Sequence, residues 1–295
     1  MLYDLNVPWS PSTTDSQLLQ TLTLSASLGY GAVALNTTLT QAPSGQQGVP
    51  FPKLSPDSSA KLPRILHRAT LVLDDPAASN FSLPALVRIY DILAVRPLSD
   101  KAFQNACLTF DTPIISMDLT QNLGFYFRPK PCMAAVSRGV RFEICYSQAL
   151  AADARGRAQF IANATGLIRA TRGRGIMISS EARNALGLRA PADVVNLLEV
   201  WGLGREKGME GLGSVPRSVV VNEGVKRTGF RGVVDVVQAL DAPFTKEKQE
   251  GQPGQGSNKK DKKQKRKNGE ETQKGDKHQS KKMKLVSRDA DTAKK

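Results

Sequence analysis

The sequence is poor in cysteine, histidine and aromatic residues. It has three cysteines and two histidines among 295 residues, and aromatic residues make up 6% of the chain. Cys107, Cys132 and Cys145 lie far apart without a C-x-x-C pair, which excludes a disulfide framework and a structural zinc site. His67 is the only histidine of the body of the chain, since His278 lies near its C-terminus. A metal site built on several imidazoles cannot be assembled, and we expect no metal or other cofactor.

Long apolar runs and the common catalytic motifs are also lacking. No stretch approaches the roughly 18 consecutive apolar residues of a membrane-spanning helix, and the N-terminus lacks the basic-then-apolar layout of a signal peptide. We therefore expect neither a secreted nor a membrane protein. Gly202, Gly204 and Gly208 miss the G-x-G-x-x-G spacing, and the sequence has neither G-x-x-x-x-G-K-[ST] nor a G-x-S-x-G elbow. Nothing places a histidine beside a cysteine, which disfavours covalent nucleophilic catalysis.

Charge, in contrast, is abundant and unevenly distributed. The chain has 41 Lys+Arg and 27 Asp+Glu, a formal net charge of +14. Residues 246–295 hold 17 basic and 8 acidic side chains, which is 17 − 8 = +9. Residues 1–127 hold 7 basic and 9 acidic (−2), whereas residues 128–231 hold 17 basic and 8 acidic (+9). The arginine-rich region 128–231 lies in a part of the chain that can fold, so it is the more specific indication of an anionic partner.

Residues 246–295 are predicted to form a disordered, lysine-rich tail, and residues 1–245 the folded body. The tail has no aromatic residue and almost nothing to bury, so conformational entropy opposes its folding. Basic runs are typical of nuclear localisation signals or nucleic-acid patches. A merely solubilising tail is the alternative. The residues predicted for nuclear targeting are Lys259, Lys260, Lys262, Lys263, Lys265, Arg266 and Lys267.

In the body, short apolar strands alternate with helical segments. Thr14 and Gln17 form a capping-box pair ahead of apolar residues at helical spacing. The alternation indicates βα units with a parallel sheet, and the length is typical of a single (β/α)₈ TIM-like barrel of about 250 residues. A doubly wound open sheet is the alternative. The predicted strands are Leu2–Asn6, Ala32–Leu35, Ile65–Leu73, Ile89–Val95, Pro113–Met117, Val140–Cys145 and Gly175–Ser179, and residues 37–63 are predicted to be a surface loop.

Carboxylates near the strand ends leave an enzymatic hypothesis open. Asp4 and Asp118 lie close to predicted strand ends, and Glu143 lies inside a strand. The carboxyl ends of barrel strands carry the active site, and carboxylate oxygens hold Mg²⁺. The alternative function is therefore a metal-dependent phosphoesterase or nuclease. We favour the other interpretation, in which Asp4 and Glu143 pair with buried arginines or cap helices, because barrels of this kind usually add imidazole ligands.

Basic residues in the turns of residues 128–231 are the candidate phosphate ligands. Glycine beside Arg172 and Arg174 lets a backbone approach a phosphate, whose oxygens match the guanidinium fork. Ordinary solvated charge, or burial of Arg141 or Arg189 against Glu143 or Asp193, is the alternative. The predicted contacts to RNA phosphates or to partner carboxylates are Arg172, Arg174, Arg138, Arg141, Lys226 and Arg227, followed by Arg128, Lys130 and Arg189.

Aromatic residues precede one of these basic residues. Phe125, Tyr126 and Phe127 come directly before Arg128. Aromatic rings stack on unpaired bases in RNA complexes. We nevertheless expect at least two of the three in the core.

An ordered set of short blocks along residues 1–235 resembles a known family, although no single block is decisive. The blocks are Asp4–Asn6, Leu28–Tyr30 with Val33–Asn36, Tyr90–Val95, Phe125–Arg128, Arg138–Ile144 with Tyr146-Ser147, Ile178–Ala182, Leu188–Val194 with Asn196-Leu197, and Arg227-Thr228. Together they resemble the 30 kDa TIM-barrel protein subunit of eukaryotic and archaeal ribonuclease P. Eukaryotic members of that family also belong to ribonuclease MRP. The loop 37–63 and the tail fall outside the resemblance.

The resemblance implies a function. In that family the RNA removes 5′ leaders from precursor tRNA, while the protein barrel braces the catalytic RNA and pairs with a small subunit of RRM-like fold. The barrel is similar to that of His-rich phosphoesterases, but the ribonuclease P members lack those metal ligands. We therefore expect a non-catalytic RNA-binding subunit of ribonuclease P (tRNA processing) and ribonuclease MRP (rRNA processing), in the nucleus and nucleolus. The implied partners are the catalytic RNA, precursor tRNA and the small subunit, with an import receptor for the tail.

A third hypothesis concerns the tail. A ribosome-biogenesis scaffold would bind RNA through residues 246–295 alone, because a basic run binds phosphates without sequence preference. Deleting the tail separates this hypothesis from the barrel subunit.

Overall fold

The computed structural model describes residues 1–41, 52, 62–75, 81–230 and 234–235. The predicted tail with its targeting residues Lys259–Lys267, and most of the predicted loop 37–63, lie outside these residues. The folded unit spans Met1–Ala239. Within the described residues no helix is long and apolar enough to cross a membrane.

Seven parallel strands form one sheet in which sequence neighbours are also spatial neighbours. This sequential order is that of a barrel, because a doubly wound sheet reverses its strand order. The predicted TIM-like barrel is therefore confirmed, and the doubly wound alternative is wrong. The strands are β1 (Leu2–Pro8), β2 (Tyr30–Leu39), β3 (Arg64–Leu73), β4 (Ile92–Pro97), β5 (Ile114–Ser116), β6 (Arg141–Cys145) and β7 (Ile176–Ser179).

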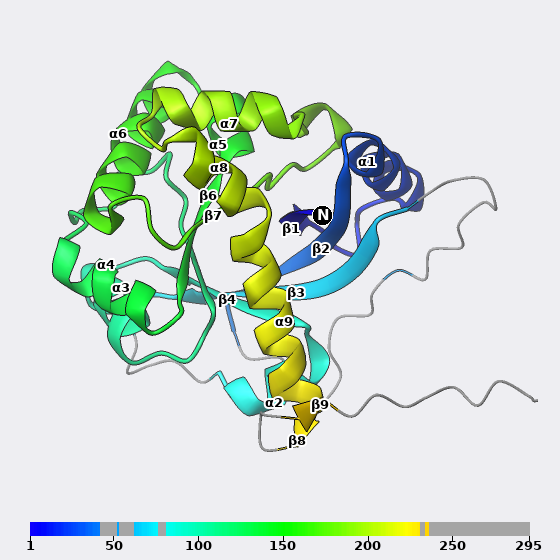
Figure 1. Ribbon diagram of the computed structural model, residues 1–295, viewed down its shortest axis with the longest axis horizontal. Helices are drawn as coiled ribbons and strands as arrows, with labels where there is room; N and C mark the ends of the chain where they lie inside the picture. Colours follow the sequence, from blue (N-terminus) through cyan, green and yellow to red (C-terminus); the bar gives the residue numbers. More distant parts are fainter. Residues whose placement is uncertain (42–51, 53–61, 76–80, 231–233, 236–295) are drawn as a thin grey trace, which may run out of the picture. The chain divides into compact units, whose positions relative to one another are not determined.

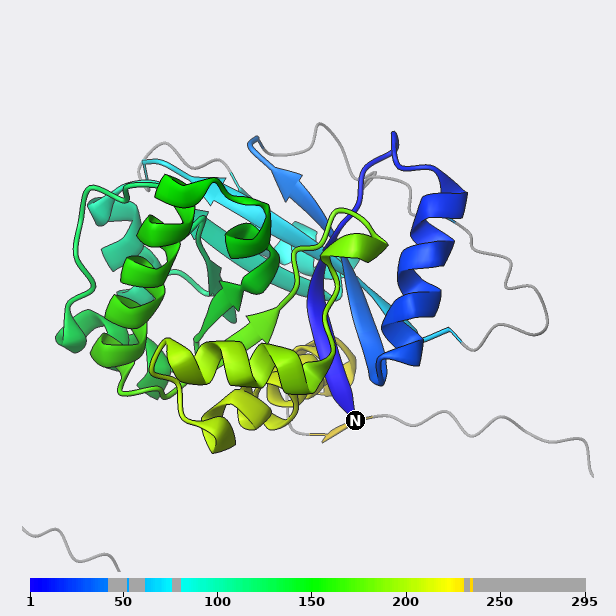
Figure 2. The same ribbon diagram turned by 90° about the horizontal axis from the view of Figure 1, so that it is seen from above.

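Helices lie around the outside of the strands, with α1 on one side and α6 on the other (Figures 1 and 2). The first helix begins where the capping pair predicts, since the Thr14 side chain accepts a hydrogen bond from Gln17 N. The helices are α1 (Asp15–Ser27), α2 (Leu83–Ile89), α3 (Asp100–Leu108), α4 (Pro129–Ser137), α5 (Tyr146–Ala151), α6 (Ala154–Thr171), the 3₁₀ turn η1 (Ala185–Gly187), α7 (Pro191–Val200), α8 (Arg205–Leu212) and α9 (Ser214–Thr228). A short antiparallel pair, β8 (Gly229–Phe230) and β9 (Val234–Asp235), follows.

In the part of the chain that the structure describes, the barrel is nearly closed between β1 and β7, with no further parallel strand between them. Glu181 N, just past β7, donates to Asn6 O of β1 at 2.8 Å. Ser180 N donates to the Asp4 carboxylate at 2.9 Å. Among the described residues the chain continues after β7 into α7, α8 and α9 rather than into another parallel strand. The seven strands predicted from the sequence thus correspond to the seven strands of the sheet, one fewer than in a (β/α)₈ barrel.

The amino-end half of the barrel interior is apolar and is covered by α9. Leu5, Leu66, Ile92 and Met177, from four different strands, pack in one cluster with Val219 of α9. Figure 1 shows α9 crossing in front of the strands. Burying each such side chain stabilises the fold by about 1.5–3 kcal/mol. The last long helix therefore completes the core at this end.

The carboxyl-end half of the interior is polar. Arg68 donates to both carboxylate oxygens of Glu143, at 2.6 and 2.7 Å, and neither side chain is exposed. Asn6 also donates to Glu143, at 3.1 Å, and accepts from Asn36 at 2.8 Å. Thr70 donates to Asn36 at 2.8 Å. These five side chains satisfy one another, which keeps the cost of their burial low.

The predicted strand Ile89–Val95 is wrong at its beginning. Helix α2 ends at Ile89 and strand β4 starts at Ile92. The segment between α2 and β4 is linked to β3, because Asp91 N donates to His67 O at 2.8 Å. A helix of seven residues is too short to display a helical period in the sequence.

Candidate nucleic-acid interface

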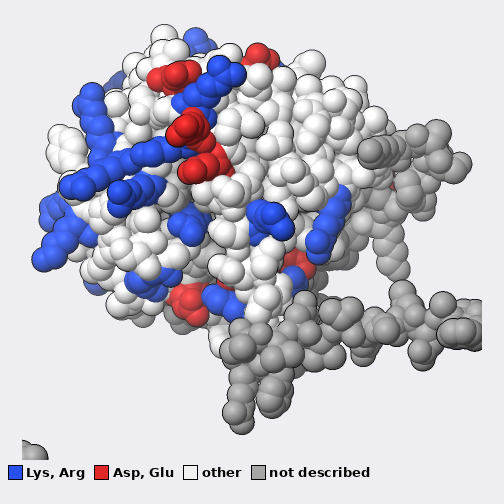
Figure 3. All heavy atoms as spheres, in the orientation of Figure 1, with Lys and Arg blue, Asp and Glu red and all other residues white. Residues whose placement is uncertain are grey.

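The six first-choice basic residues gather at the amino end of the barrel. Arg138 and Arg141 lie at the start of β6, and Arg172 and Arg174 lie directly before β7. Lys226 and Arg227, in the last turn of α9, complete the set. Figure 3 shows lysine and arginine side chains crowding the side of α6 and α8, while the side of α1 is mainly uncharged. This end is opposite to the one that carries the active site in barrel enzymes.

The turn after α6 fixes Arg172 and Arg174 on the surface. Arg172 ends the helix in the left-handed conformation, with φ 56°, and Gly173 and Gly175 follow with φ 65° and 66°. Gly173 N donates to Ile168 O at 2.8 Å, which closes the turn. Both arginine side chains are exposed, and neither guanidinium has a hydrogen-bond or ion-pair partner in the described part of the chain. Both remain available to an external anion.

A recess of about 330 Å³ lies beside this turn. Three cationic side chains line it, Arg141, Arg174 and Lys207, against one carboxylate, Glu210. Arg141 Nε is buried without a hydrogen-bond partner, and burial lowers the pKa of Arg141. An anion bound in the recess would supply a hydrogen-bond acceptor for Arg141 Nε and a negative charge that compensates the guanidinium.

The first turn of α9 forms the opposite wall of this recess. Ser214, Val215 and Ser218 line it. The first N–H groups of a helix have no partner within the helix and carry the positive end of its dipole. At α9, however, Pro216 has no N–H and Arg217 N already donates to Gly213 O, so the cationic side chains rather than the backbone favour a phosphate or a carboxylate here.

The glycines of the turn line the recess and also serve packing. A Cβ at Gly173 would lie 2.9 Å from Lys207 Cδ, and one at Gly175 would lie 2.9 Å from Val136 Cγ2. The sequence predicted these glycines as openings for a phosphate. The structure fills both positions with neighbouring side chains, so the glycines allow the left-handed turn and the close approach of α4 and α8.

Three of the six first-choice basic residues are already engaged within the chain. Arg138 donates to Cys107 O at 2.8 Å and to Phe110 O at 2.9 Å, and thereby caps the end of α3. Lys226 pairs with Glu223 at 2.9 Å, and Arg227 pairs with Asp91. These contacts anchor α4 and α9, so the three side chains have less freedom to bind RNA than Arg172 and Arg174.

The second-choice residues lie away from this recess. Arg128 and Lys130 are exposed at the start of α4. Arg189 lines a separate recess at the carboxyl end, and its guanidinium donates to Leu186 O and Leu188 O, both at 2.7 Å. The alternative pairing of Arg189 with Asp193 does not occur.

The aromatic run before Arg128 divides as expected. Phe125 and Phe127 pack on Phe103 of α3, with ring centroids 5.0 and 5.6 Å apart. Tyr126 is 91% exposed. The prediction that at least two of the three rings are core residues is confirmed, and Tyr126 is the one ring of the run available for stacking.

The carboxylates of the enzymatic hypothesis are engaged in protein contacts. Glu143 is paired with Arg68, Asp4 accepts from the backbone of Ser180, and Asp118 accepts from Thr120. In the described ranges no group of three His, Cys, Asp or Glu side chains is placed to hold a metal ion. The interpretation that Glu143 pairs with a buried arginine is confirmed.

The arginine that pairs with Glu143 was not among the predicted site residues. We had considered Arg141 for this role, but the partner is Arg68. Arg68 is the only charged residue between Ile65 and Leu73 in an otherwise largely apolar strand, apart from the ionisable His67. A buried cation requires an anionic partner, so an arginine inside an apolar strand predicts a buried ion pair.

Sequence comparison places the chain among named relatives. The family described as RNase P subunit p30 matches residues 1–228. The chain is 36% identical over 237 residues to "Probable ribonuclease P protein subunit 3" of Schizosaccharomyces pombe, covering 80% of this chain and 99% of that protein. It is 30% identical over 240 residues to "Ribonuclease P/MRP protein subunit RPP1" of Saccharomyces cerevisiae, covering 75% and 80%. It is 34% identical over 177 residues to "Ribonuclease P protein subunit p30" of Mus musculus, covering 59% and 65%.

Structure comparison finds the same architecture. A chain in the cryo-EM structure of archaeal ribonuclease P with mature tRNA superposes with a TM-score of 0.60 at 14% identity, covering 81% of this chain and 100% of that chain. At this identity the likeness concerns the fold, and it agrees with the barrel described above.

Proposed function

Because the chain belongs to the RNase P subunit p30 family, we propose that it is a non-catalytic, RNA-binding protein subunit of ribonuclease P and ribonuclease MRP. The observation that carries the RNA-binding role is the recess at the amino end of the barrel. There Arg141, Arg174 and Lys207 face the single carboxylate of Glu210, and Arg172 stands exposed beside them.

Phosphate chemistry explains why this surface suits RNA. Each phosphodiester carries one negative charge, and its release of counterions favours binding to clustered cations. The guanidinium fork of Arg172 or Arg174 matches two phosphate oxygens at once. Tyr126, exposed beside Arg128 on another part of the surface, adds a ring on which an unpaired base can stack.

A non-catalytic role is supported by the carboxyl end of the barrel. Glu143 would be the natural metal ligand there, but Arg68 neutralises it completely within the core. A divalent cation placed beside this pair would meet the positive charge of Arg68. In the holoenzyme the RNA is therefore proposed to perform the cleavage, and the protein braces it.

The reactions, partners and location extend the same proposal. The ribonuclease P particle would process precursor tRNA, and the MRP particle would process rRNA. A small subunit of RRM-like fold is the proposed protein partner, and the nucleus and nucleolus are the proposed location, reached through the basic run Lys259–Lys267. The family membership and the relative named for both particles support the assignment to ribonuclease P and MRP.

Charge reversal tests the RNA surface directly. In cells expressing tagged full-length chain, the double variant Arg172→Glu with Arg174→Glu is expected to lower the amount of co-purified ribonuclease P and MRP RNA about tenfold. Arg155→Glu, an exposed arginine of α6 outside the recess, is the matched control. Unchanged recovery of RNA by the double variant, at an unchanged unfolding temperature, would contradict the assignment.

Two further arms address the competing hypotheses. Replacing residues 246–295 by an unrelated nuclear localisation signal, which preserves import, is expected to leave both RNAs bound, whereas a tail-only binder would lose them. The purified chain is expected to show no metal-dependent nuclease activity. Such an activity, if it were lost in Asp4→Ala, would support the enzymatic hypothesis instead. Sequencing of the co-purified RNA is the readout that identifies the particle.

A further inference from the structure

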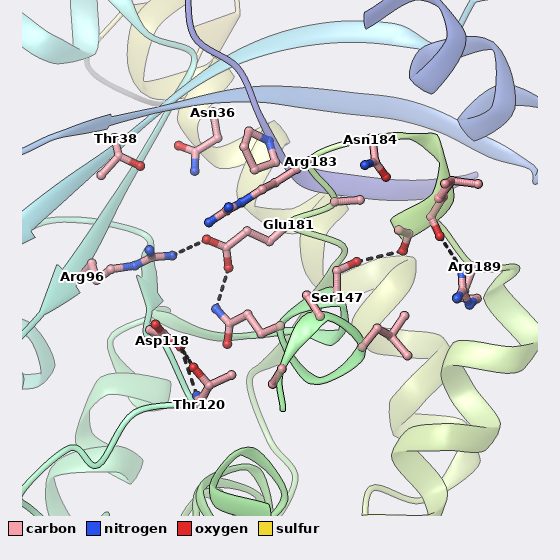
Figure 4. Close-up of a pocket in the computed structure, with 18 residues that line it drawn as sticks. Asn36, Thr38, Arg96, Asp118, Thr120, Ser147, Glu181, Arg183, Asn184 and Arg189 are labelled. Carbon is pink, nitrogen blue, oxygen red and sulfur yellow. Dashed lines mark hydrogen bonds and ion pairs between the residues drawn. The ribbon is translucent and has the colours of Figure 1, made fainter. Parts of the chain in front are cut away.

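A second recess, of about 750 Å³, opens at the carboxyl end of the barrel (Figure 4). The ends of the strands, α5 and the segment around η1 line it. This is the end at which barrel proteins bind small ligands, and the volume falls in the range of ligand pockets, about 300–1,000 Å³. The RNA surface proposed above lies at the opposite end, so this recess needs an account of its own.

Three guanidinium groups and two carboxylates line the recess, namely those of Arg96, Arg183 and Arg189 and those of Asp118 and Glu181. Arg96 Nη2 binds Glu181 Oε1 at 2.8 Å, with 17% and 18% of the two side chains exposed. In Figure 4 the Arg183 guanidinium points into the recess beside this pair. Arg183 makes no hydrogen bond or ion pair with any residue that the structure describes. One positive charge is therefore left uncompensated at this point of the recess.

Unused donors accompany this charge. Arg96 Nε is buried and has no hydrogen-bond partner. Both oxygens of Glu181 are occupied, Oε1 by Arg96 and Oε2 by the Gln148 amide. Although each carboxylate oxygen can accept a further hydrogen bond, Arg183 makes none to Glu181 in the described part of the chain. An incoming group with several acceptor oxygens and negative charge would satisfy both arginines.

The backbone of Glu181 is strained in a manner typical of binding sites. Its φ is 54°, a left-handed conformation that non-glycine residues seldom adopt. Its N–H is held by Asn6 O, which fixes the turn directly after β7 and keeps the carboxylate between Arg96 and Gln148. Such strain costs on the order of 1 kcal/mol and persists where surrounding contacts over-determine the geometry.

The rest of the lining narrows the chemistry of the ligand. Its apolar members, Pro8, Leu150 and Leu186 among them, include no aromatic ring on which a base could stack. Hydroxyl and amide groups are plentiful, including Thr38 and Asn184. Such groups suit a phosphate and ribose hydroxyls better than a stacked base.

We propose that this recess binds the phosphate and ribose of a nucleotide, with the phosphate held by Arg96 and Arg183. The nucleotide is either free or the 5′-phosphorylated end of an RNA strand, two sources that share the same chemistry. Only the second source rests on the proposed function.

Calorimetric titration of the purified full-length chain tests this. Inorganic phosphate and AMP are expected to bind, whereas adenosine is not. Arg183→Gln is expected to weaken AMP binding about tenfold, as for the loss of a charge-assisted pair. Asp118→Asn, which removes a negative charge from the lining and keeps the acceptor used by Thr120, is expected to tighten it severalfold. Arg64→Gln, exposed at the start of β3 at the opposite end, is the matched control.

The outcomes separate the sources. A short 5′-phosphorylated RNA that binds more tightly than AMP, and weakens on removal of its phosphate, identifies a strand end; equal affinities identify a free nucleotide. No AMP binding by the wild type, equal binding of adenosine, or an unaltered Arg183→Gln variant would overturn the proposal. AMP binding retained by the Arg172→Glu, Arg174→Glu variant distinguishes this recess from the RNA surface, so either proposal can fail alone.

Discussion

Arg68 and Glu143 form a two-bond ion pair across the centre of the barrel, with both side chains completely buried. Removing one partner leaves the other charge buried without compensation, which costs about 3–5 kcal/mol. We expect Arg68→Met and Glu143→Gln each to lower the free energy of unfolding by an amount of this order. Equilibrium unfolding in urea measures it.

The double replacement and a surface pair supply the controls. Arg68→Met combined with Glu143→Gln is expected to be less destabilising than the sum of the two single losses, because no unpaired charge remains. Lys101→Ala breaks an exposed pair, in which Lys101 and Asp75 are 72% and 52% exposed, and should cost no more than about 0.5 kcal/mol. Equal costs at the buried and exposed pairs would refute the assigned role of Arg68.

Asp4 should make stability depend on pH. Burial raises its pKa from 3.8 to about 6, although hydrogen bonds from Ser180 and Asn6 oppose the rise. The folded state therefore favours the protonated carboxyl, and the resulting stability is complete below pH 3.8 and lost as pH rises through 6. Asp4→Asn, which imitates the protonated form, is expected to raise the free energy of unfolding above pH 6 by up to about 3 kcal/mol.

Urea titrations between about pH 4 and pH 8 check this prediction. The difference between Asp4→Asn and the wild type should shrink toward pH 4, and a difference that does not change with pH would contradict it. The contribution of Glu143 to stability depends on pH in the opposite direction. Burial alone would raise its pKa, but the Arg68 guanidinium outweighs burial and lowers it. Its contribution is therefore lost only as pH falls below the ordinary glutamate value of 4.5.

Alanine variants of Arg138 and Arg174 should distinguish a residue that stabilises the fold from one that binds RNA. Arg138 holds the carbonyl groups at the end of α3, so Arg138→Ala is expected to lower the free energy of unfolding by about 1–2 kcal/mol. Arg174, exposed and without a partner among the described residues, should tolerate Arg174→Ala with a change of less than about 0.5 kcal/mol. The amount of bound RNA should fall in Arg174→Ala. Matched stability losses in the two variants would show that Arg174 is structural.

Gly175 and Gly224 form a matched pair of glycines. Gly175 has φ 66°, and an added Cβ would meet Val136 Cγ2 at 2.9 Å. Gly175→Ala is therefore expected to cost about 1–3 kcal/mol. Gly224 lies inside α9 with nothing within 4 Å of an added Cβ, so Gly224→Ala should stabilise the chain by about 0.5–1 kcal/mol. Thermal unfolding midpoints that move in the same direction would disprove this contrast.

Local signals predicted the barrel strands well. Capping residues such as Thr14 and apolar runs such as Ile65–Leu73 depend on neighbours in sequence, so they can be recognised without tertiary information. Helix α8 could not be recognised in this way, because its glycines weaken the helical signal. Gly211 lies there because a Cβ would come within 3.1 Å of Ile176 O, so the glycine allows α8 to pack directly against β7. That requirement exists only in the folded chain.

The sequence predicted most of the basic residues that the candidate site contains, but not how their side chains are arranged. The charge count located the basic turn at Arg172 and Arg174, and the structure places Arg141 and Lys207 beside it. Sequence could not show that Arg138 is committed to the α3 carbonyls, since that contact spans 31 residues. Nor could it show the pairing of Arg96 with Glu181, 85 residues apart, because nothing local links the two strands' ends.

The position of α9 has a consequence for biosynthesis. Val219 of this helix buries itself against side chains of β1, β3, β4 and β7, which were made much earlier. Because a nascent chain leaves the ribosome with its N-terminus first, the amino end of the barrel stays uncovered until residues 214–228 have been synthesised and have emerged. Contacts between such distant segments also fold slowly. The interval between completing β7 and docking α9 is thus when a chaperone, or a partner subunit acting as one, has most to protect.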